Sequence, residues 1–275
     1  GANSQITSSG GAVSVAGSGT SNSEVVRLDS SGAITSGSNA SITVTADSAS
    51  IDASSGINSG NGQTTIRPRT AGTQIDLGGA DVLSGSPLTL GLTSAEVNLI
   101  TAGSLVIGLD DIATGTATVS SPIAPANSSA LELITARNIV VGANLTAGSG
   151  GLTLRANQQA TASSGNFVGI DVNGATVTTT GGGDVLLLGR GGDSSDFNLG
   201  VQVRGGGVVS GSGTVTATGT GGSSTGVFNH GIHVSGVNSQ ITSSGAAVSV
   251  LGMGGGTGSS SNNYGVNVNS GGMIT

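Results

Sequence analysis

The sequence predicts an all-β fold, a right-handed parallel β-helix with three short strands in each coil. The first observation behind this prediction is a pattern that recurs in the last hundred residues. Each copy begins at a glycine, and these are Gly169, Gly200, Gly231 and Gly265, so the spacings are 31, 31 and 34 residues. A fixed period of this size is typical of a solenoid, in which every repeat stacks on the next.

The second observation is that apolar and polar residues alternate within each copy. A period of two indicates strands rather than helices. The segments are rich in Val, Ile and Thr, which favour strands, and the 52 glycines of the chain would each cost a helix about 1 kcal/mol. Further strands are expected after the opening strand of each copy. They cover 176–180 and 184–188 in the first copy, 214–218 in the second, and 240–244 and 247–251 in the third. Residues 214–218 are expected to be the second strand of their copy.

The third observation is a return of the chain to its own beginning. Residues 1–15 read GANSQITSSGGAVSV and residues 236–250 read GVNSQITSSGAAVSV, with two differences. Residues 25–35 match 265–275 in pattern. We therefore predict one continuous solenoid over 1–275, in which 1–35 repeats as 236–275, and we expect it to be a segment of a longer repetitive protein.

Residues 36–160 predict tighter coils than the coils of 31 to 34 residues over 161–275. All four prolines fall there and are expected at corners, because proline cannot donate to a central ladder. The strands predicted in this part cover 41–45, 64–67, 74–77, 105–108, 117–120, 138–141 and 152–155.

A short lateral helix is predicted near 94–99. Thr93 can cap its start, and Glu96 can reach back to the backbone of Thr93, which together form a capping box.

The composition limits the classes of partner. The net charge is −7, and the seven basic residues are all arginines, so the chain is poorly suited to neutralise phosphates and no nucleic-acid partner is expected. The absence of cysteine excludes a disulfide framework and a thiolate metal site. No apolar run approaches the ~20 residues that span a bilayer, so no membrane span is expected in this segment.

Two stretches of the tighter region resemble a known family. Residues 86–96 (SPLTLGLTSAE) with 100–108 (ITAGSLVIG), and residues 145–154 (LTAGSGGLTL), are similar to segments of filamentous-haemagglutinin-like giant secreted bacterial β-helix proteins and of repetitive autotransporter passengers. The resemblance covers about residues 70–160. It implies export to the cell surface or the extracellular space, a long fibrous shape and a role in adhesion, and it carries no catalytic residues.

Acidic and basic residues of the later repeats are candidates for an enzyme site. Polysaccharide-degrading β-helices use clustered carboxylates on one outer face. The residues nearest to such a set are Asp171, Asp184, Asp193 and Asp196 with Arg190 and Arg204. Because the sequence does not gather them into one motif, we predict no enzyme, no catalytic residues and no cofactor.

Two pairs of residues are candidates for metal sites. Asp193 and Asp196 share a glycine-rich loop, but Ca²⁺ needs six or more oxygens, and whether they bind it stays open. His230 and His233 lie three apart without an obvious further ligand. His233 is expected to face outward in a column with Asp171, Gln202 and Asn267. No metal site is predicted.

The four aromatic residues all lie just before a repeat-opening glycine, each near an asparagine. They are predicted to form one column beside the core, either as a ladder that closes the loops or as a strip that stacks on sugars. They are Phe167, Phe197, Phe228 and Tyr264, with Asn166, Asn198, Asn229 and Asn263.

Threonines at 176, 178 and 180 and at 214, 216 and 218 suggest stacked outward arrays of the kind that bind ice.

The leading expectation is a structural, non-enzymatic segment of a giant exported protein, acting as a fibre, stalk or adhesin shaft. Roughly ten or eleven coils at about 4.8 Å each would give a rod about 50 Å long. Its expected partners are further copies or repeats of itself, end to end, and surface glycans. The alternatives are a polysaccharide-binding or polysaccharide-degrading β-helix and an ice-binding solenoid. One contact tests the register: Arg204 should reach Asp171 across one coil.

Overall fold

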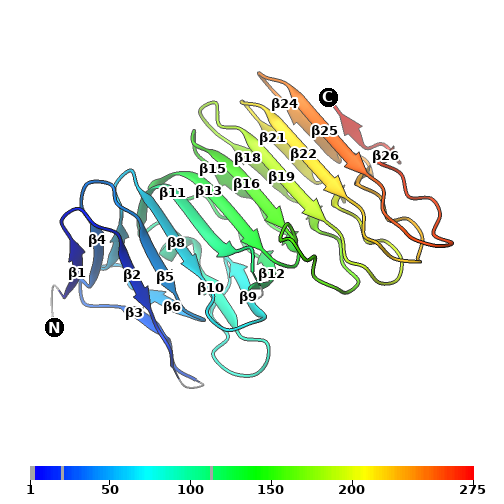
Figure 1. Cartoon of the computed structure of the whole chain (residues 1–275). Helices are drawn as coiled ribbons and strands as arrows, with labels where there is room; N and C mark the ends of the chain where they lie inside the picture. The colour runs from blue at the N-terminus through cyan, green and yellow to red at the C-terminus, as the bar shows by residue number, and fades with distance from the viewer. Residues whose placement is uncertain (1–3, 20–21, 112–113) are drawn as a thin grey trace.

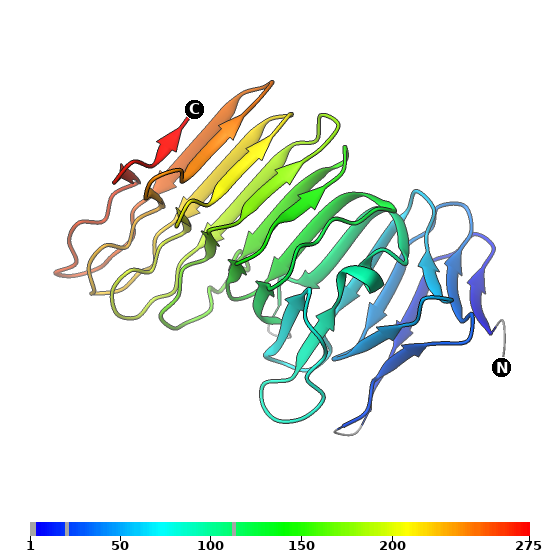
Figure 2. The ribbon, with the colours of Figure 1, turned by 180° about the vertical axis from the view of Figure 1, so that it is seen from behind.

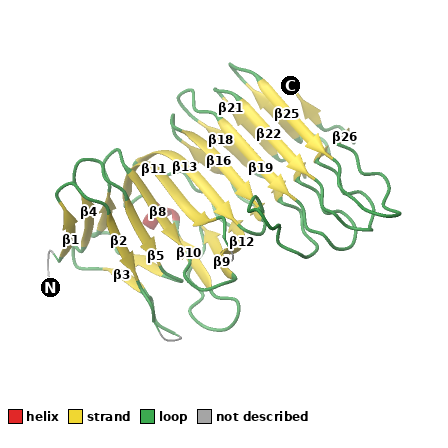
Figure 3. Ribbon diagram, viewed as in Figure 1, coloured by secondary structure: helices red, strands yellow, loops and turns green. Residues whose placement is uncertain are grey.

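Parallel strands stack coil upon coil along the chain, with the two termini at opposite ends (Figure 1). The computed structural model describes residues 4–19, 22–111 and 114–275. The fold is a parallel β-helix, as predicted. Each coil contributes to three faces, which we call the first, second and third face in chain order. Figure 3 shows that these faces consist of strands joined by loops.

The second face carries the longest ladder. Within the described residues it contains one strand from each of nine coils, at about 4.8 Å per strand, so its length is about 40 Å. This one ladder is slightly shorter than the predicted rod of roughly ten or eleven coils and about 50 Å. The strands are β2 (Val13–Ala16), β5 (Ile42–Thr45), β8 (Gln63–Arg67), β11 (Ile100–Leu109), β13 (Ser128–Thr135), β16 (Gly151–Ala156), β19 (Val185–Arg190), β22 (Val215–Thr220) and β25 (Val248–Met253).

The third face consists of two separate ladders. The first is the pair β3 (Val26–Leu28) and β6 (Ala49–Ile51). The second runs through β10 (Thr89–Leu92), β9 (Thr73–Leu77), β12 (Thr114–Val119), β14 (Ile139–Val141), β17 (Ile170–Asn173), β20 (Val201–Arg204), β23 (Ile232–Ser235) and β26 (Val266–Asn269).

The first face is also divided. Its amino-terminal ladder is β1 (Gln5–Ser8), β4 (Ala33–Ser36), β7 (Gly56–Asn58) and the start of β11. Its carboxy-terminal ladder is β15 (Leu145–Ala147), β18 (Thr176–Thr179), β21 (Val208–Gly211), β24 (Gln240–Ser243) and β27 (Met273–Ile274).

The predicted register is confirmed on the third face. Ile170 pairs with Val201, Val201 with Ile232, and Ile232 with Val266, which reproduces the spacing of the repeat-opening glycines. Most coils within 36–160 are tighter, as predicted, but the step from Thr64 to its partner Leu105 is longer than any step in the later coils. On the second face Leu131 pairs with Leu152 and Leu152 with Val185, and the first of these two steps along the chain is much the shorter.

One strand was assigned to the wrong place. Residues 214–218 were expected to be the second strand after Gly200, but they belong to β22 on the second face, between β19 and β25. The strand that precedes them is β21, which pairs with β18 and β24. It was missed because Val208 and Val209 are adjacent and lie between glycines, so this segment lacks alternation.

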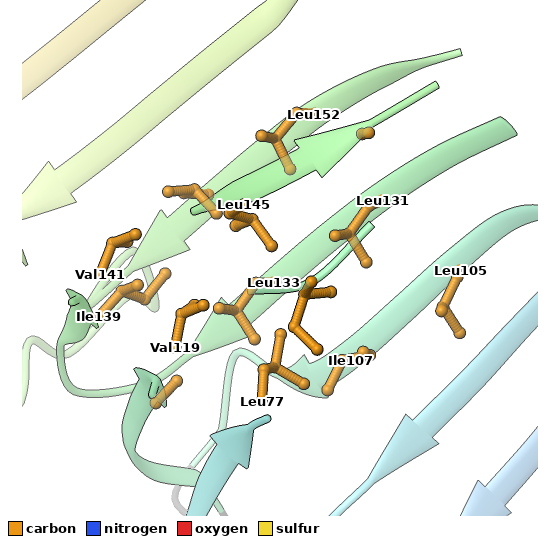
Figure 4. Close-up of a cluster of buried hydrophobic side chains, with 14 of the residues drawn as sticks. Leu77, Leu105, Ile107, Val119, Leu131, Leu133, Ile139, Val141, Leu145 and Leu152 are labelled. Atoms are coloured by element: carbon orange, nitrogen blue, oxygen red, sulfur yellow. The ribbon is translucent and has the colours of Figure 1, made fainter. Parts of the chain in front are cut away.

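The interior is a continuous column of aliphatic side chains. In Figure 4, leucines from successive second-face strands lie in line and face aliphatic residues of the third face. Leu105, Leu131 and Leu152 are at most 1% exposed. Burial of each such side chain stabilises the fold by about 1.5–3 kcal/mol. Because each contacts its counterparts above and below, no coil has a core of its own.

The predicted helix is present as α1 (Ser94–Val97), shorter than 94–99. Its capping box is confirmed, since the Thr93 hydroxyl accepts from the Glu96 backbone N–H and the Glu96 carboxylate accepts from the Thr93 N–H. The helix lies on the side of the solenoid (Figure 2). No helix within the described ranges has both the length and the apolar character needed to cross a membrane.

An insertion interrupts the third face. After β9 the chain turns back, and β10 pairs in parallel with β9 on the side away from β12, next to β6. The regular coil pattern resumes only at β11. The ladder that begins with β3 and β6 therefore ends at this insertion.

Candidate functional site

Asp171 and Arg204 form a bidentate ion pair across adjacent coils. Arg204 Nε lies 3.0 Å from Asp171 Oδ1, and Nη2 lies 2.7 Å from Oδ2. The contact predicted from the register is confirmed. Asp171 is buried although it points outward, and its hydrogen bond raises the pKa of Arg204. Both groups are thus occupied by a contact between β17 and β20, which leaves neither as a free acid or base.

The other three candidate carboxylates each accept a backbone N–H from a neighbouring coil. Asp184 Oδ1 accepts from Thr214 at 2.6 Å, Asp193 Oδ1 from Gly165 at 2.8 Å and Asp196 Oδ1 from Val227 at 2.7 Å. These bonds join successive loops, so the carboxylates are spread along the axis. The described ranges contain no group of three His, Cys, Asp or Glu side chains that could hold a metal ion.

Arg190 lies at the end of β19 and donates to the carbonyl oxygen of Gln159 at 3.4 Å, one coil earlier. Like the carboxylates, it contacts a neighbouring coil, and its hydrogen bond goes to backbone.

The predicted asparagine ladder is confirmed for three of its four members. Asn198 Oδ1 accepts from the Phe167 N–H at 3.2 Å, Asn229 Oδ1 from the Asn198 N–H at 3.0 Å, and Asn263 Oδ1 from the Asn229 N–H at 2.8 Å. Each side chain therefore satisfies the backbone of the coil before it. Asn166 lies one residue before Phe167, which occupies the corresponding position.

The aromatic residues do not form one column. Phe197 and Phe228 stack at 5.1 Å with an interplanar angle of 14°, but Tyr264 stacks on His230 at 5.2 Å and Arg137 lies 5.0 Å from the Phe167 ring centroid. The prediction of a single column was wrong, because the rings lie one, two or three residues before the repeat-opening glycine. In the Phe197–Phe228 pair each ring covers part of the other's face.

His233 occupies the predicted column, since Gln202 pairs with His233 and His233 with Asn267. It is half-buried rather than exposed, because His230 packs against it with ring centroids 5.4 Å apart. His230 Nδ1 accepts from the Tyr264 N–H at 3.1 Å. Burial, with a smaller effect from His233, lowers the pKa of His230 to about 4. The His230 ring that accepts the hydrogen bond from the next coil is therefore a neutral imidazole at neutral pH.

The threonine arrays do not stack on each other. Thr176 and Thr178 pair with Val208 and Ser210 on the first face, whereas residues 214–218 lie on the second face. A column of hydroxyl side chains lies on the first face instead. In it Ser210 Oγ lies 3.1 Å from Thr178 Oγ1, and Thr275 Oγ1 lies 3.0 Å from Thr242 Oγ1.

Two carboxylates at the β10 insertion contact β6, a role that the sequence did not predict for either of them. Asp81 accepts from the Ala49 N–H at 3.0 Å and the Gly91 N–H at 2.7 Å, and Glu96 accepts from the Ile51 N–H at 3.2 Å. They therefore accept hydrogen bonds from backbone N–H groups along the edge of β6. Burial raises the pKa of Asp81 to about 7, and the charges of Glu96 and Glu24 add to the rise. No periodicity marks Asp81, so no sequence signal pointed to it.

A hollow of about 270 Å³ lies between the loops of the first three coils. Val25, Asp47, Arg69 and Leu83 are among its lining residues. Asp47 is occupied by the N–H groups of Arg69 and Thr70 at 2.8 and 2.7 Å, so its carboxylate holds the loop in place.

A comparison of the chain with protein-family models, with curated proteins and with solved structures found no match. The fold and these contacts define a parallel β-helix whose polar side chains form hydrogen bonds between adjacent coils.

Proposed function

We propose that the chain is a structural, non-enzymatic segment of an exported repeat protein, serving as a fibre, stalk or adhesin shaft at the cell surface. The observation that carries the proposal is the unbroken second-face ladder from β2 to β25. Residues from nine coils lie in one column of Cα partners along it, from Ser14 through Glu132 to Ser249.

The mechanical argument starts from the direction of the bonds. Backbone hydrogen bonds between coils run along the axis of the solenoid, so each coil is held to the next by several of them. Bending or stretching the rod must strain many bonds together with a closely packed core. A stiff rod of this kind keeps the segments at its two ends at a fixed distance from each other.

The side chains that were candidates for catalysis support the same proposal. Asp171, Asp184, Asp193 and Asp196 each accept hydrogen bonds from a neighbouring coil. An acid–base pair of a glycosidase needs two carboxyls on either side of one bond. The resemblance of residues 86–108 and 145–154 to filamentous-haemagglutinin-like proteins also favours an exported fibre and a surface location.

Glycan binding is a second candidate, favoured by the exposure of two rings. Phe197 is 56% and Tyr264 is 52% exposed. Their stacking partners cover part of each face, so a sugar could use only the remaining area. Loss of glycan binding in Phe197→Ala and Tyr264→Ala variants, measured on a glycan array, would support this candidate.

Pulling the chain from its two ends in an optical trap tests the mechanical proposal. We expect the rod to resist extension and then to lose coils in discrete steps, each releasing about 20 to 40 residues, in line with the nearest-neighbour stability of solenoids. A gradual extension at low force would contradict the proposal. A Leu131→Ala variant, with a cavity in the middle of the core, should start to yield at lower force.

A further inference from the structure

A second hollow, of about 320 Å³, lies in the middle of the second face, over the strands from β11 to β22 (Figure 1). Two carboxylates line it, Glu132 on β13 and Asp184 directly before β19, two coils later. Both point outward from the solenoid, because their neighbours Leu131 and Val185 point into the core. The strand β8 lies beyond β11 and β25 lies beyond β22, so this second-face hollow has further coils on both sides.

The hollow exists because the coil between the two carboxylates contributes a glycine. Gly151 lies beside Asp184, because the residues that follow them are Cα partners on β16 and β19. The φ of Gly151 is 100°, a conformation that favours glycine. Glu132 and Asp184 are separated by two strand spacings, about 9.6 Å along the axis, with the bare backbone of Gly151 on the coil between them. A group much larger than a single ion can therefore lie between the two carboxylates.

Glu132 carries a half-buried charge that the fold leaves without a hydrogen-bond partner. Its carboxylate accepts no hydrogen bond from the part of the chain that the structure describes. Burial raises the pKa of Glu132, and a smaller effect from the charge of Arg155 lowers it. The Arg155 guanidinium is itself bound to Asp110, with Nη2 3.0 Å from Oδ2. The negative charge of Glu132 is therefore poorly compensated, and a positively charged ligand would stabilise it.

Asp184 and three hydroxyl groups complete the set of polar groups in the hollow. Asp184 Oδ1 accepts from the Thr214 N–H at 2.6 Å, and its Oδ2 accepts from no described residue. The hydroxyls of Ser104, Thr153 and Thr216 line the hollow and form no hydrogen bond within the described ranges. Because a hydroxyl both donates and accepts, these groups suit a ligand that carries hydroxyls of its own.

We propose that the second-face hollow binds an amino sugar with a free, positively charged amino group, as a unit of a glucosamine polymer. The ammonium group contacts Glu132 and Asp184, and the sugar hydroxyls exchange hydrogen bonds with Thr153 and Thr216. A lysine side chain would meet the carboxylates but would leave the hydroxyl groups of the hollow without partners. The volume far exceeds the ~15 Å³ that holds one water molecule.

The charge of the whole chain favours the same ligand. A net charge of −7 attracts a cationic polymer and repels an acidic one. The site is separate from Phe197 and Tyr264, which lie in loops that follow the second-face strands, whereas the hollow lies over the earlier parts of those strands. The inference goes beyond the proposed function, because a stiff shaft needs no ligand.

Calorimetric titration with a glucosamine tetramer, at a pH where its amines are protonated, tests the proposal. We expect the tetramer to bind, and its fully N-acetylated counterpart, which has no charge, to bind at least about tenfold more weakly. Glu132→Gln should weaken binding of the glucosamine tetramer by about tenfold or more, because the contact with the ammonium group loses its charge. The matched control is Asp193→Asn, which removes one negative charge from an exposed loop outside the hollow and should leave the affinity unchanged.

The stability of the variants separates binding from folding. Glu132→Gln should be at least as stable in urea as the parent chain, because burial disfavours the charge that it removes. Asp184→Asn keeps an oxygen that can accept from the Thr214 N–H, so it should also fold, and it should also bind more weakly.

Four results would overturn the proposal. They are no binding of the glucosamine tetramer, equal binding of its acetylated counterpart, equal binding of a lysine tetrapeptide, and an unchanged affinity in Glu132→Gln. The optical-trap measurement does not involve the hollow, so failure of this proposal is distinguishable from failure of the proposed function.

Discussion

Arg204 lies diagonally across one coil from Asp171 and holds both of its carboxylate oxygens, at 3.0 and 2.7 Å. The pair joins β17 to β20, and the carboxylate is largely buried while the guanidinium is half-exposed. A contact of this kind fixes the register of two coils, because a shift of one residue would turn one partner to the interior.

Replacing Arg204 by alanine should destabilise the fold by about 1–3 kcal/mol, because the buried Asp171 would lose two charged hydrogen bonds. The measurement is the free energy of unfolding in urea. The matched control is Arg27→Ala, since the side chain of Arg27 is 64% exposed in its ion pairs and should contribute at most about 1 kcal/mol. Equal losses in the two variants would contradict the structural role of the pair.

Asp81 should make the chain less stable as the pH rises through about 7. Its pKa is about 7 in the folded chain, whereas its ordinary value is 3.8, so folding binds a proton between these values. Its contribution to stability is therefore greatest below about pH 4 and is lost as the pH rises through 7. Urea unfolding from pH 5 to pH 8 should lose this dependence in Asp81→Asn, and an unchanged slope would contradict the assignment.

His230 should act in the opposite direction. Its pKa of about 4 lies below the ordinary value of 6.5, so its contribution to stability is complete above pH 6.5 and is lost as the pH falls through 4. Protonation at Nδ1 would also break the bond from the Tyr264 N–H. We expect faster hydrogen exchange at Tyr264 as the pH falls from 6.5 to 4, after correction for intrinsic rates. In His230→Phe this extra acceleration should be absent.

Gly222 should not tolerate a side chain. A Cβ there would overlap the carbonyl oxygen of Gly192 in the adjacent loop, whereas at Gly142 the nearest atom would be 3.6 Å away. Gly222→Ala should destabilise the fold by about 1–3 kcal/mol or more through overpacking. Thermal unfolding compares the two variants, and a Gly142→Ala variant that lost as much stability would contradict the argument from close approach.

Most features of the fold that were predicted correctly depend on the regular spacing of the sequence repeats. The spacing of the repeat-opening glycines set the register of β17, β20, β23 and β26, and from it the contact between Asp171 and Arg204 followed directly. The capping box of Thr93 and Glu96 was also predictable, because it depends on residues three positions apart.

The parts that were missed depend on distant segments or on irregular ones. Phe197 and Tyr264 fell into different columns because they lie at different distances along the chain from the glycine that follows them. Asp81 lies in an aperiodic loop, and its role at β6 exists only because β10 turns back beside β9. Such contacts arise from the path of the chain, which local alternation does not encode.

The distance between Ser14 and Ser249 tests the rod most directly. Both face outward in one column of the second face, at its first and last coil, eight strand spacings of about 4.8 Å apart. Single-molecule energy transfer between dyes on Ser14→Cys and Ser249→Cys should give one narrow distribution at about 40 Å, the length set by the strand spacing. This distribution should persist up to global unfolding. A broad distribution, or a distance that drifts in mild denaturant before the chain unfolds, would contradict a continuous stiff shaft.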